Sequence, residues 1–345
     1  MQEISLIKPS DCHIHLRDKS FLARTVNDAV NQFSNIIVMP NLQPPVVTVE
    51  EAHNYKRRIL QHIKDSSCNI YLALYLSQKT DLETVKLAAK SENIIGFKLY
   101  PEGVTTNSEQ GVKDISSMTE VLSWLEEYQV PLLIHGEDNK HGIDIFDKEK
   151  SFIDSTLNDI HIKFPKLKIT LEHITTKEAV DFVLSTDDNI GATITCHHLW
   201  LNRNDVINTK IHPHNFCLPI AKRRHHQEAL IAAAISGNSK FFLGTDSAPH
   251  PIESKESNCG CAGIYTASHA TELYTEIFDN YNALDKLESF ASINGPKFYN
   301  MKLTHERISL IKSSNKIPLK LEFGESAVVP FRAGLETNWQ LINKE

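Results

Sequence analysis

Short runs of apolar and β-branched residues recur along the chain, and segments with helical periodicity separate them. We expect eight of these runs to form strands, and they cover Asp11–Leu16, Asn35–Pro40, Asn69–Leu76, Ile94–Pro101, Val130–Glu137, Leu167–Ile174, Asn189–His197 and Lys240–Pro249. Several runs are almost continuously apolar, which is typical of strands buried on both faces of a parallel sheet. The intervening segments are long enough for the helical crossovers that join parallel strands.

Four of the intervening segments begin with Ser or Thr followed three residues later by Glu, a pattern that caps the N-terminus of a helix. The four pairs are Thr48/Glu51, Thr80/Glu83, Ser117/Glu120 and Thr175/Glu178. A strand followed by a capped helix, repeated around eight times, predicts an α/β fold of the (β/α)8 TIM-barrel type. A doubly wound open sheet is the alternative. It usually carries a Gly-rich turn after its first strand, and the chain contains no G-x-G-x-x-G or G-x-x-x-x-G-K-[ST] motif.

With 345 residues, the chain is long enough for two domains of about 150 residues, but one barrel of about 250 residues with additions fits equally well. The segment from about Leu284 to Glu345 is typical of closing helices followed by short strands such as Ile317–Phe323 and Ser326–Phe331. We therefore expect a single TIM-barrel domain over residues 1–345, with residues 284–345 as a small C-terminal extension packed on the barrel.

The balance of charge argues against two classes of partner. Thirty-six Lys and Arg residues stand against 43 Asp and Glu residues, which gives a net charge of −7, and no run of basic residues occurs. Neither a nucleic acid nor an anionic membrane surface is therefore an expected partner. The longest apolar stretches are far shorter than the roughly 18 residues that span a bilayer, and Glu3 and Lys8 interrupt any signal-peptide core.

Six cysteines are scattered along the chain without the spacing of a secreted disulfide framework. This distribution favours reduced thiols and a cytoplasmic location. Cys259 and Cys261 form a Cys-Gly-Cys pair, but no second pair stands near them in the sequence to complete a tetrahedral thiolate site. We therefore interpret them as loop thiols.

Chemistry-bearing residues collect at the C-terminal ends of the predicted strands, where TIM-barrel enzymes build their active sites. His13 and His15 lie on the first predicted strand, and the later strands carry Lys98, His135, His173 and Asp246. Because His13 and His15 are two residues apart, their side chains project to the same face and would suit a metal ion. An H-x-H pattern alone is also compatible with two incidental histidines.

Lys98 lies in an otherwise apolar strand, where its ammonium must find a partner or lose its charge. One interpretation is an interior ion pair, with Asp246 as the candidate partner. The other is a neutral amine that takes up CO2 to form a carbamate, whose two oxygens can bridge two divalent metal ions.

Considered singly, His135 and His173 are more typical of core histidines, and Asp246 of a cap. Considered together, four His, one Lys and one Asp converge on one barrel mouth, and such nitrogen and oxygen ligands suit Zn²⁺ or a similar divalent ion. Because six ligands exceed what one tetrahedral zinc needs, two metal ions that share a bridging ligand and a bridging hydroxide are the economical arrangement.

The motifs around these residues match a known family. In chain order, the motifs are Asp11–Asp18, Met39–Leu42, Gly96–Pro101, His135–Glu137, Glu172–Thr176, Gly244–His250, Cys259–Gly263 and Asn294–Pro296. On these motifs the chain resembles the amidohydrolase superfamily and, within it, the dihydroorotase family of the shorter bacterial type (class II). The motifs are long and keep their order along most of the chain.

The resemblance implies an activity and a set of metal ligands. The implied reaction is the reversible cyclisation of N-carbamoyl-L-aspartate to (S)-dihydroorotate in de novo pyrimidine (UMP) biosynthesis, with a homodimer as the implied assembly. It implies two Zn²⁺ ions, one held by His13, His15 and Asp246, the other by His135 and His173, and both bridged by carboxylated Lys98 (N6-carboxylysine) and a hydroxide. The hydroxide would be the nucleophile, with Asp246 as general base and then general acid.

The resemblance also implies how the anionic substrate is bound. Arg17, Asn41 and His250 would bind its carboxylate, since an arginine fork suits that group. Backbone groups of Leu218 and Ala262 would meet the polar edge of the ring. The loop Glu102–Asn107 would close as a lid, with hydrogen bonds donated by Thr105 and Thr106.

Two other functions remain open at this point. A related amidohydrolase, such as a hydantoinase or an allantoinase, would share the metal ligands, but Arg17, Asn41 and His250 favour an acidic substrate. A catalytically inactive barrel that serves as a scaffold is the other alternative, although all six candidate ligands are present. The remaining histidines of interest match no ligand position and are interpreted as loop or helix-surface residues: His197, His198, His212, His214, His225 and His226.

Overall fold

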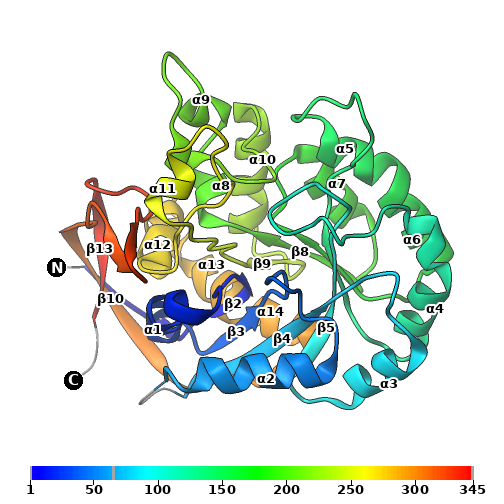
Figure 1. Ribbon diagram of the computed structural model, residues 1–345. Helices are drawn as coiled ribbons and strands as arrows, with labels where there is room; N and C mark the ends of the chain where they lie inside the picture. The colour runs from blue at the N-terminus through cyan, green and yellow to red at the C-terminus, as the bar shows by residue number, and fades with distance from the viewer. Residues whose placement is uncertain (1, 64–66, 343–345) are drawn as a thin grey trace.

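The computed structural model describes residues 2–63 and 67–342, and a closed arrangement of eight parallel strands lies at its centre (Figure 1). The strands follow one another around the barrel in chain order: β2 (Ser10–Ile14), β3 (Asn35–Val38), β4 (Asn69–Tyr75), β5 (Ile94–Leu99), β6 (Leu132–His135), β7 (Ile169–Glu172), β8 (Ile190–Ile194) and β9 (Phe241–Leu243). A parallel bridge between Ile14 and Ser247 brings the last strand back to the first. The predicted TIM-barrel fold is therefore confirmed.

Each predicted run overlaps one of these strands and extends beyond it at its C-terminal end, and β2 begins one residue before its run, at Ser10. The largest difference is at the last run, where only Phe241–Leu243 of the predicted Lys240–Pro249 forms β9. Beyond β9, Asp246 adopts a left-handed backbone (φ 45°), which turns the chain out of the sheet. The polar residues at the ends of the predicted runs thus lie largely in the loops that begin at the barrel mouth.

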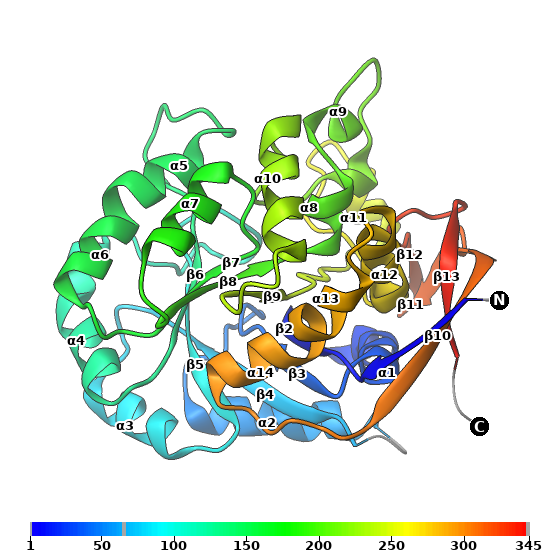
Figure 2. The same ribbon diagram turned by 180° about the vertical axis from the view of Figure 1, so that it is seen from behind.

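Helices surround the barrel in both views (Figures 1 and 2). Those between the strands are α1 (Leu22–Gln32), α2 (Val49–Leu60), α3 (Leu82–Lys90), α4 (Thr119–Glu127), α5 (Lys148–Phe152), α6 (Asn158–Lys163), α7 (Lys177–Ser185), α8 (Cys196–Trp200), α9 (Arg203–Val206) and α10 (Arg224–Ile235). They are followed by α11 (Ile252–Lys255), α12 (Ala270–Asn280), α13 (Leu284–Glu288) and α14 (Asn294–Tyr299). Every helix in the described part of the chain is too short or too polar to cross a bilayer.

One predicted helix cap is confirmed and three are wrong. Thr48 and Glu51 form the reciprocal capping box of α2. At α3 the cap is Asp81, one residue after the predicted Thr80, and at α7 it is Thr176, one residue after Thr175. In both cases a second side chain that can accept a hydrogen bond follows the predicted one, and it takes the position from which it reaches the first turn.

Ser117 lies inside a short 3-10 helix, Ile115–Met118, that is capped by Asp114 and leads directly into α4. The helical turn therefore begins before the Ser117/Glu120 pair, so Ser117 cannot cap α4. The side-chain cap is at the start of the 3-10 helix, where Asp114 accepts a hydrogen bond from the Ser116 backbone N–H.

The C-terminal segment closes the barrel end opposite the candidate site. An apolar cluster fills the barrel interior with Cys12, Ile37, Met39, Ala73, Ile95, Leu133, Phe242, Tyr299 and Met301. Tyr299 ends α14, and its hydroxyl donates a hydrogen bond to Thr170 Oγ1 on β7 at 2.6 Å. A Cβ at Gly295 of α14 would lie only 2.4 Å from Cys12 Sγ, so this glycine permits the close approach of α14 to β2.

The last strands lie at one side of the barrel (Figure 2). β10 (Arg307–Lys316) pairs with β13 (Glu336–Ile342) and with the N-terminal β1 (Glu3–Ile7), while β11 (Leu321–Phe323) and β12 (Ser326–Val328) form a hairpin. The prediction of a strand over Ile317–Phe323 is wrong in its first half. β10 ends at Lys316 and Pro318 follows closely, and proline cannot donate to a strand ladder. That residues 1–345 form one domain stays a prediction.

We expect the tail sheet and the barrel to unfold together, because Trp339 of β13 is fully buried and its indole N–H donates to Asp279 Oδ2 on α12 at 3.1 Å. Trp339→Ala should lower the free energy of unfolding by about 3–5 kcal/mol. Urea unfolding followed by circular dichroism should still show one transition. Leu319→Ala, at a side chain that is 71% exposed, is the control and should change stability by less than about 0.5 kcal/mol. Two separate transitions would contradict the single-domain prediction.

Candidate active site

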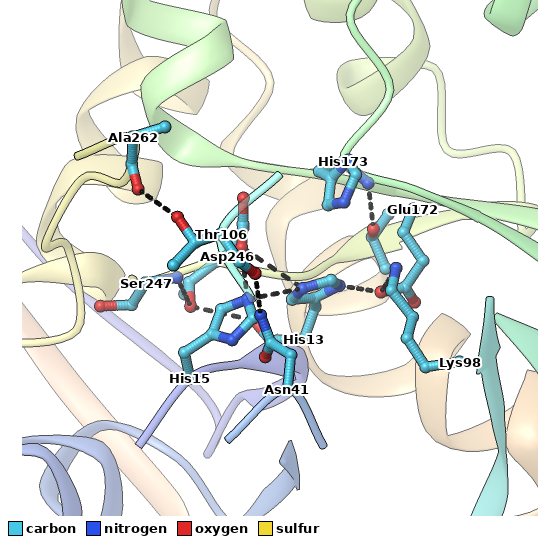
Figure 3. A network of polar contacts seen from close by, with 12 residues as sticks. His13, His15, Asn41, Lys98, Thr106, Glu172, His173, Asp246, Ser247 and Ala262 are labelled. Atoms are coloured by element: carbon cyan, nitrogen blue, oxygen red, sulfur yellow. Dashed lines mark hydrogen bonds and ion pairs between the residues drawn. The ribbon is translucent and has the colours of Figure 1, made fainter. Parts of the chain in front are cut away.

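Three of the predicted ligands meet at the mouth of the barrel (Figure 3). His15 Nε2 lies 3.0 Å from Asp246 Oδ1 and 3.3 Å from His13 Nε2, and His13 Nε2 lies 3.3 Å from Asp246 Oδ1. All three side chains are buried. Such a group of imidazole nitrogens and a carboxylate oxygen has the donor types and spacing of a divalent metal site.

An irregularity in β2 helps to direct both histidines into the cavity. The pairing register between β2 and β3 shifts between Asp11 and Ile14. Cys12 packs into the barrel core, yet His13, its neighbour, lines the cavity together with His15. Irregularities of this kind commonly re-aim a side chain next to an active site.

His135 and His173 complete the cluster of imidazoles. The centroid of the His173 ring lies 4.8 Å from that of His135 and 5.0 Å from that of His13. His173 is buried and its Nδ1 has no hydrogen-bond partner among the described residues. Burial lowers the pKa of His173 well below its usual value, and the nearby Lys98 lowers it further. A neutral imidazole with an unused nitrogen is the form that binds a metal ion.

Lys98 is fully buried beneath this cluster, and its partner differs from the predicted one. Its Nζ lies 3.3 Å from Glu172 Oε2, whereas no direct contact with Asp246 forms. Burial lowers the pKa of Lys98 well below its ordinary value, and the charge of Asp246 opposes this shift. The partner that an ion pair would use is therefore Glu172 and not Asp246, whereas the low pKa of Lys98 favours the neutral amine that the carbamate interpretation requires.

Three buried carboxylates that we assigned no role hold the predicted ligands in place. Asp11 Oδ1 accepts hydrogen bonds from the backbone N–H groups of His13 and Thr245, at 3.0 and 2.9 Å. Glu137 Oε2 lies 2.8 Å from His135 Nε2, and Glu172 Oε2 contacts His13 Nδ1. Each carboxylate lies within two positions of a predicted ligand in an otherwise apolar segment, and this proximity is the signal that could have identified them.

Two of the predicted ligands and one substrate residue have unusual backbone conformations. Arg17, His173 and Asp246 have positive φ angles of 60°, 41° and 45°. Hydrogen bonds hold the two ligands in this conformation, from Asp246 N to His13 O at 2.8 Å and from His173 N to Thr193 Oγ1 at 2.6 Å. Residues other than glycine rarely adopt a backbone conformation with positive φ, and such backbone strain concentrates at functional sites.

Arg17 is fixed at the mouth of the barrel by two interactions. Its Nε donates to Pro249 O at 3.0 Å, and its Nη2 donates to His250 Nε2 at 3.0 Å. Burial lowers the pKa of His250 to about 2, and the charge of Arg17 acts in the same direction. His250 is therefore neutral and accepts the hydrogen bond, which orients the guanidinium.

The predicted lid loop lies over the cavity. Asn41 Nδ2 donates to Thr106 O at 3.1 Å, and Asn107 Nδ2 donates back to Asn41 O at 2.9 Å. Thr106 Oγ1 donates to Ala262 O at 3.4 Å (Figure 3), and Gln43 Nε2 donates to Asn107 Oδ1 at 2.7 Å. The loop therefore bridges the segment after β3 and the segment after α11, and it covers the site from above.

These residues surround a cavity at the barrel mouth, where about 350 Å³ is free of protein atoms if the open solvent at its entrance is included. The predicted residues that line it are His13, His15, Arg17, Asn41, Thr105, Thr106, His135, His173, Leu218, Asp246 and Ala262. Lys98 and His250 are not part of its wall, and they contact the site through Glu172 and Arg17. Tyr100, Ala248 and Gly263 also line the cavity, and sequence reasoning missed them.

The interpretation of His197 and His198 as surface residues is wrong, because both are buried in α8. They lie with Cys217 in a second group of potential ligands. Both nitrogens of His198 are already engaged, with Thr195 Oγ1 at 2.8 Å and Pro219 O at 2.9 Å. Of the other four histidines, His212 and His225 are exposed, and His214 and His226 are half-buried.

Comparison with known proteins identifies the family. No family model matches the chain. It is 50% identical to a dihydroorotase of Shewanella amazonensis over 341 residues, which cover 99% of both chains. The chain belongs to the dihydroorotase family.

Two solved dihydroorotase structures have the same fold. The enzyme from Campylobacter jejuni superimposes with a TM-score of 0.91 at 35% identity, over 99% of this chain and 98% of that one. The Saccharomyces cerevisiae enzyme, in complex with 5-fluoroorotic acid, gives a TM-score of 0.90 at 32% identity over 99% of both chains. Dihydroorotases are metal-dependent cyclic amidohydrolases, and the group of His13, His15 and Asp246 fits that requirement.

The contact of Glu172 with both His13 and Lys98 leads to a prediction for this dihydroorotase. Glu172→Gln keeps the shape of the side chain but removes the charge that orients the imidazole, so metal affinity should fall about 10–100-fold. Titration of the metal-free protein with Zn²⁺ measures this change. Glu178→Gln, at a half-buried surface position on α7, is the control and should bind as the wild type does. Equal affinity in both variants would contradict a positioning role for Glu172.

Proposed function

We propose that the chain catalyses the reversible, zinc-dependent cyclisation of N-carbamoyl-L-aspartate to (S)-dihydroorotate in de novo pyrimidine biosynthesis. The observation that carries this proposal is a single covered cavity that contains both the His13, His15 and Asp246 group and the Arg17 guanidinium. The His13, His15 and Asp246 group can hold a metal ion that activates a cyclic amide, and the Arg17 guanidinium can bind an acidic group of the substrate. The yeast relative in complex with 5-fluoroorotic acid supports a pyrimidine acid as the ligand.

The donor set suits two zinc ions in the proposed arrangement. His13, His15 and Asp246 would hold one ion, His135 and His173 the other, and carboxylated Lys98 both. When bound, the ions supply Lewis-acid activation of water and of the scissile carbonyl at neutral pH. For the carboxylation, the neutral Nζ of Lys98 attacks the carbon of CO2 and its proton passes to solvent. Full burial of Lys98 supports this step because it disfavours the ammonium.

Asp246 is proposed to move the proton. Burial alone would raise the pKa of its carboxyl group, but the contacts with His13 and His15 hold it well below the usual range. Asp246 is therefore ionised and can accept a proton from the attacking water. It then gives this proton to the ring nitrogen as that nitrogen leaves, so the carboxylate is regenerated in each turnover.

The remaining cavity residues would bind and cover the substrate. Arg17 and Asn41, with His250 behind the guanidinium, would bind the substrate carboxylate. Backbone groups of Leu218 and Ala262 would meet the ring edge. The loop that carries Thr105 and Thr106 would exclude water while the ring opens or closes.

We propose that the protein is a cytoplasmic homodimer of single-domain subunits, with the small-molecule substrate as its partner and neither nucleic acid nor membrane involved. The net charge of −7 supports the exclusion of polyanionic partners. The buried thiols of Cys12, Cys196 and Cys217 support a reducing compartment.

Metal content measured beside the turnover of dihydroorotate tests the proposed function. We expect about two metal ions per chain, loss of activity on chelation and its recovery with Zn²⁺. Dihydrouracil lacks the carboxylate that Arg17 would bind, so it should be hydrolysed at least ~100-fold more slowly. Faster turnover of hydantoin or allantoin would reassign the substrate. A zinc-loaded protein without any turnover would instead favour the scaffold alternative.

Lys98→Ala tests the carbamate. The variant should lose the bridging site and at least one metal ion per chain, and short carboxylic acids such as propionate should restore part of the activity. The control is Lys168→Ala, because Lys168 donates to Phe298 O at 2.7 Å at the opposite end of the barrel. Retention of two metal ions by Lys98→Ala without added acid would contradict carboxylation.

A further inference from the structure

One residue of the cavity wall has a hydroxyl group without a hydrogen-bond partner in the described part of the chain. Tyr100 follows β5, is only 2% exposed and lines the cavity. Among residues 2–63 and 67–342, no donor or acceptor bonds to its Oη. Burial of a polar group without a hydrogen bond destabilises a fold, so phenylalanine would serve better here if the ring only filled space.

The ring of Tyr100 is held in one place, so its hydroxyl cannot turn away to find water. The ring stacks on that of Tyr75 with centroids 5.1 Å apart, and Lys98 Nζ lies 5.2 Å from its centroid. Main-chain bonds fix the residue as well, because Tyr100 O accepts from Val112 N at 2.8 Å. The ring that carries the unused hydroxyl therefore has a fixed position among the residues that line the cavity, as a preorganised binding group requires.

The surroundings of Tyr100 define what it can bind. A phenol keeps its proton at neutral pH, so this hydroxyl can act as a hydrogen-bond donor. The Tyr100 ring lies beside His135, with centroids 6.3 Å apart, and beside Lys98. The ring therefore adjoins the proposed metal ligands, and both Asp246 and Arg17 lie close enough to act on its hydroxyl electrostatically.

We propose that the Tyr100 hydroxyl donates a hydrogen bond to the oxygen of the scissile carbonyl of the cyclic substrate. This inference rests on the function proposed above. The oxygen gains negative charge as the carbonyl carbon becomes tetrahedral, so the bond strengthens in the transition state. The ring N–H groups of dihydroorotate are hydrogen-bond donors, so they cannot accept a hydrogen bond from the Tyr100 hydroxyl. No proton is transferred, and Tyr100 returns unchanged when the ring closes or opens.

The test compares Tyr100→Phe with Tyr299→Phe in the zinc-loaded protein. Tyr299 is also a buried tyrosine, but its hydroxyl is bonded to Thr170 at the closed end of the barrel. Tyr100→Phe should lower kcat for dihydroorotate about 10²–10³-fold and leave KM nearly unchanged, while its Tm stays the same or rises. Tyr299→Phe should show the opposite pattern, with a lower Tm and a wild-type kcat.

Three results would overturn the inference. One is a wild-type kcat in Tyr100→Phe. Another is a rise in KM without a fall in kcat, since the hydroxyl would then contribute equally to binding of the ground state and of the transition state. The third is loss of bound zinc from Tyr100→Phe, because the hydroxyl would then support the metal site and not the substrate.

The outcome is separable from that of the proposed function. If the wild type hydrolyses another cyclic amide and not dihydroorotate, the substrate assignment fails. A fall in kcat of Tyr100→Phe on that other amide would still support the role of the hydroxyl, since every cyclic amide has the same scissile carbonyl.

Discussion

The open end of the barrel must keep imidazoles, a lysine and carboxylates within a few ångströms of one another and out of water. Every other feature of the site depends on this constraint. Burial lowers the pKa of His13 to about 3 and favours neutral rings, which leaves nitrogen lone pairs available to a metal ion. The carboxylates of Glu137 and Glu172 contact the rings of His135 and His13 and orient them, while Asp11 holds the backbone of His13. The groups of this site are polar, yet they are buried and their order comes from contacts with one another.

That order depends on the opposite end of the barrel. The interior below the ligands is apolar, and α14 seals it with Tyr299 while Met301 packs just beyond. Water is therefore excluded from below by side-chain packing, and from above by the loop that joins Asn41 to Ala262 through Thr106. The C-terminal segment thus supports the site although it lies far from the ligands, because its packing keeps the barrel interior below them apolar.

Much of the barrel and many of the residues at its mouth could be predicted from the sequence, because both signals are local. Buried parallel strands are short apolar runs, and the candidate ligands stand at the ends of these runs. The supporting residues could not be predicted in the same way. Glu172 acts on His13 across the barrel, and β1 pairs with β10 from the far end of the chain. The burial of His197 likewise depends on which face of α8 meets the barrel, and the short sequence of α8 does not determine that face.

The pairing of Lys98 with Glu172 connects the proposed carbamate to the proposed metal ions. As an ammonium, Lys98 would be attracted by Glu172 at 3.3 Å and by Asp246, whereas a carbamate on the same nitrogen would place a third negative charge beside them. Two like charges about 4 Å apart repel by about 4 kcal/mol at an effective dielectric constant of about 20. Divalent cations bound beside these anions would reverse the sign of the interaction. In the proposed site, carboxylation and metal binding would therefore stabilise each other.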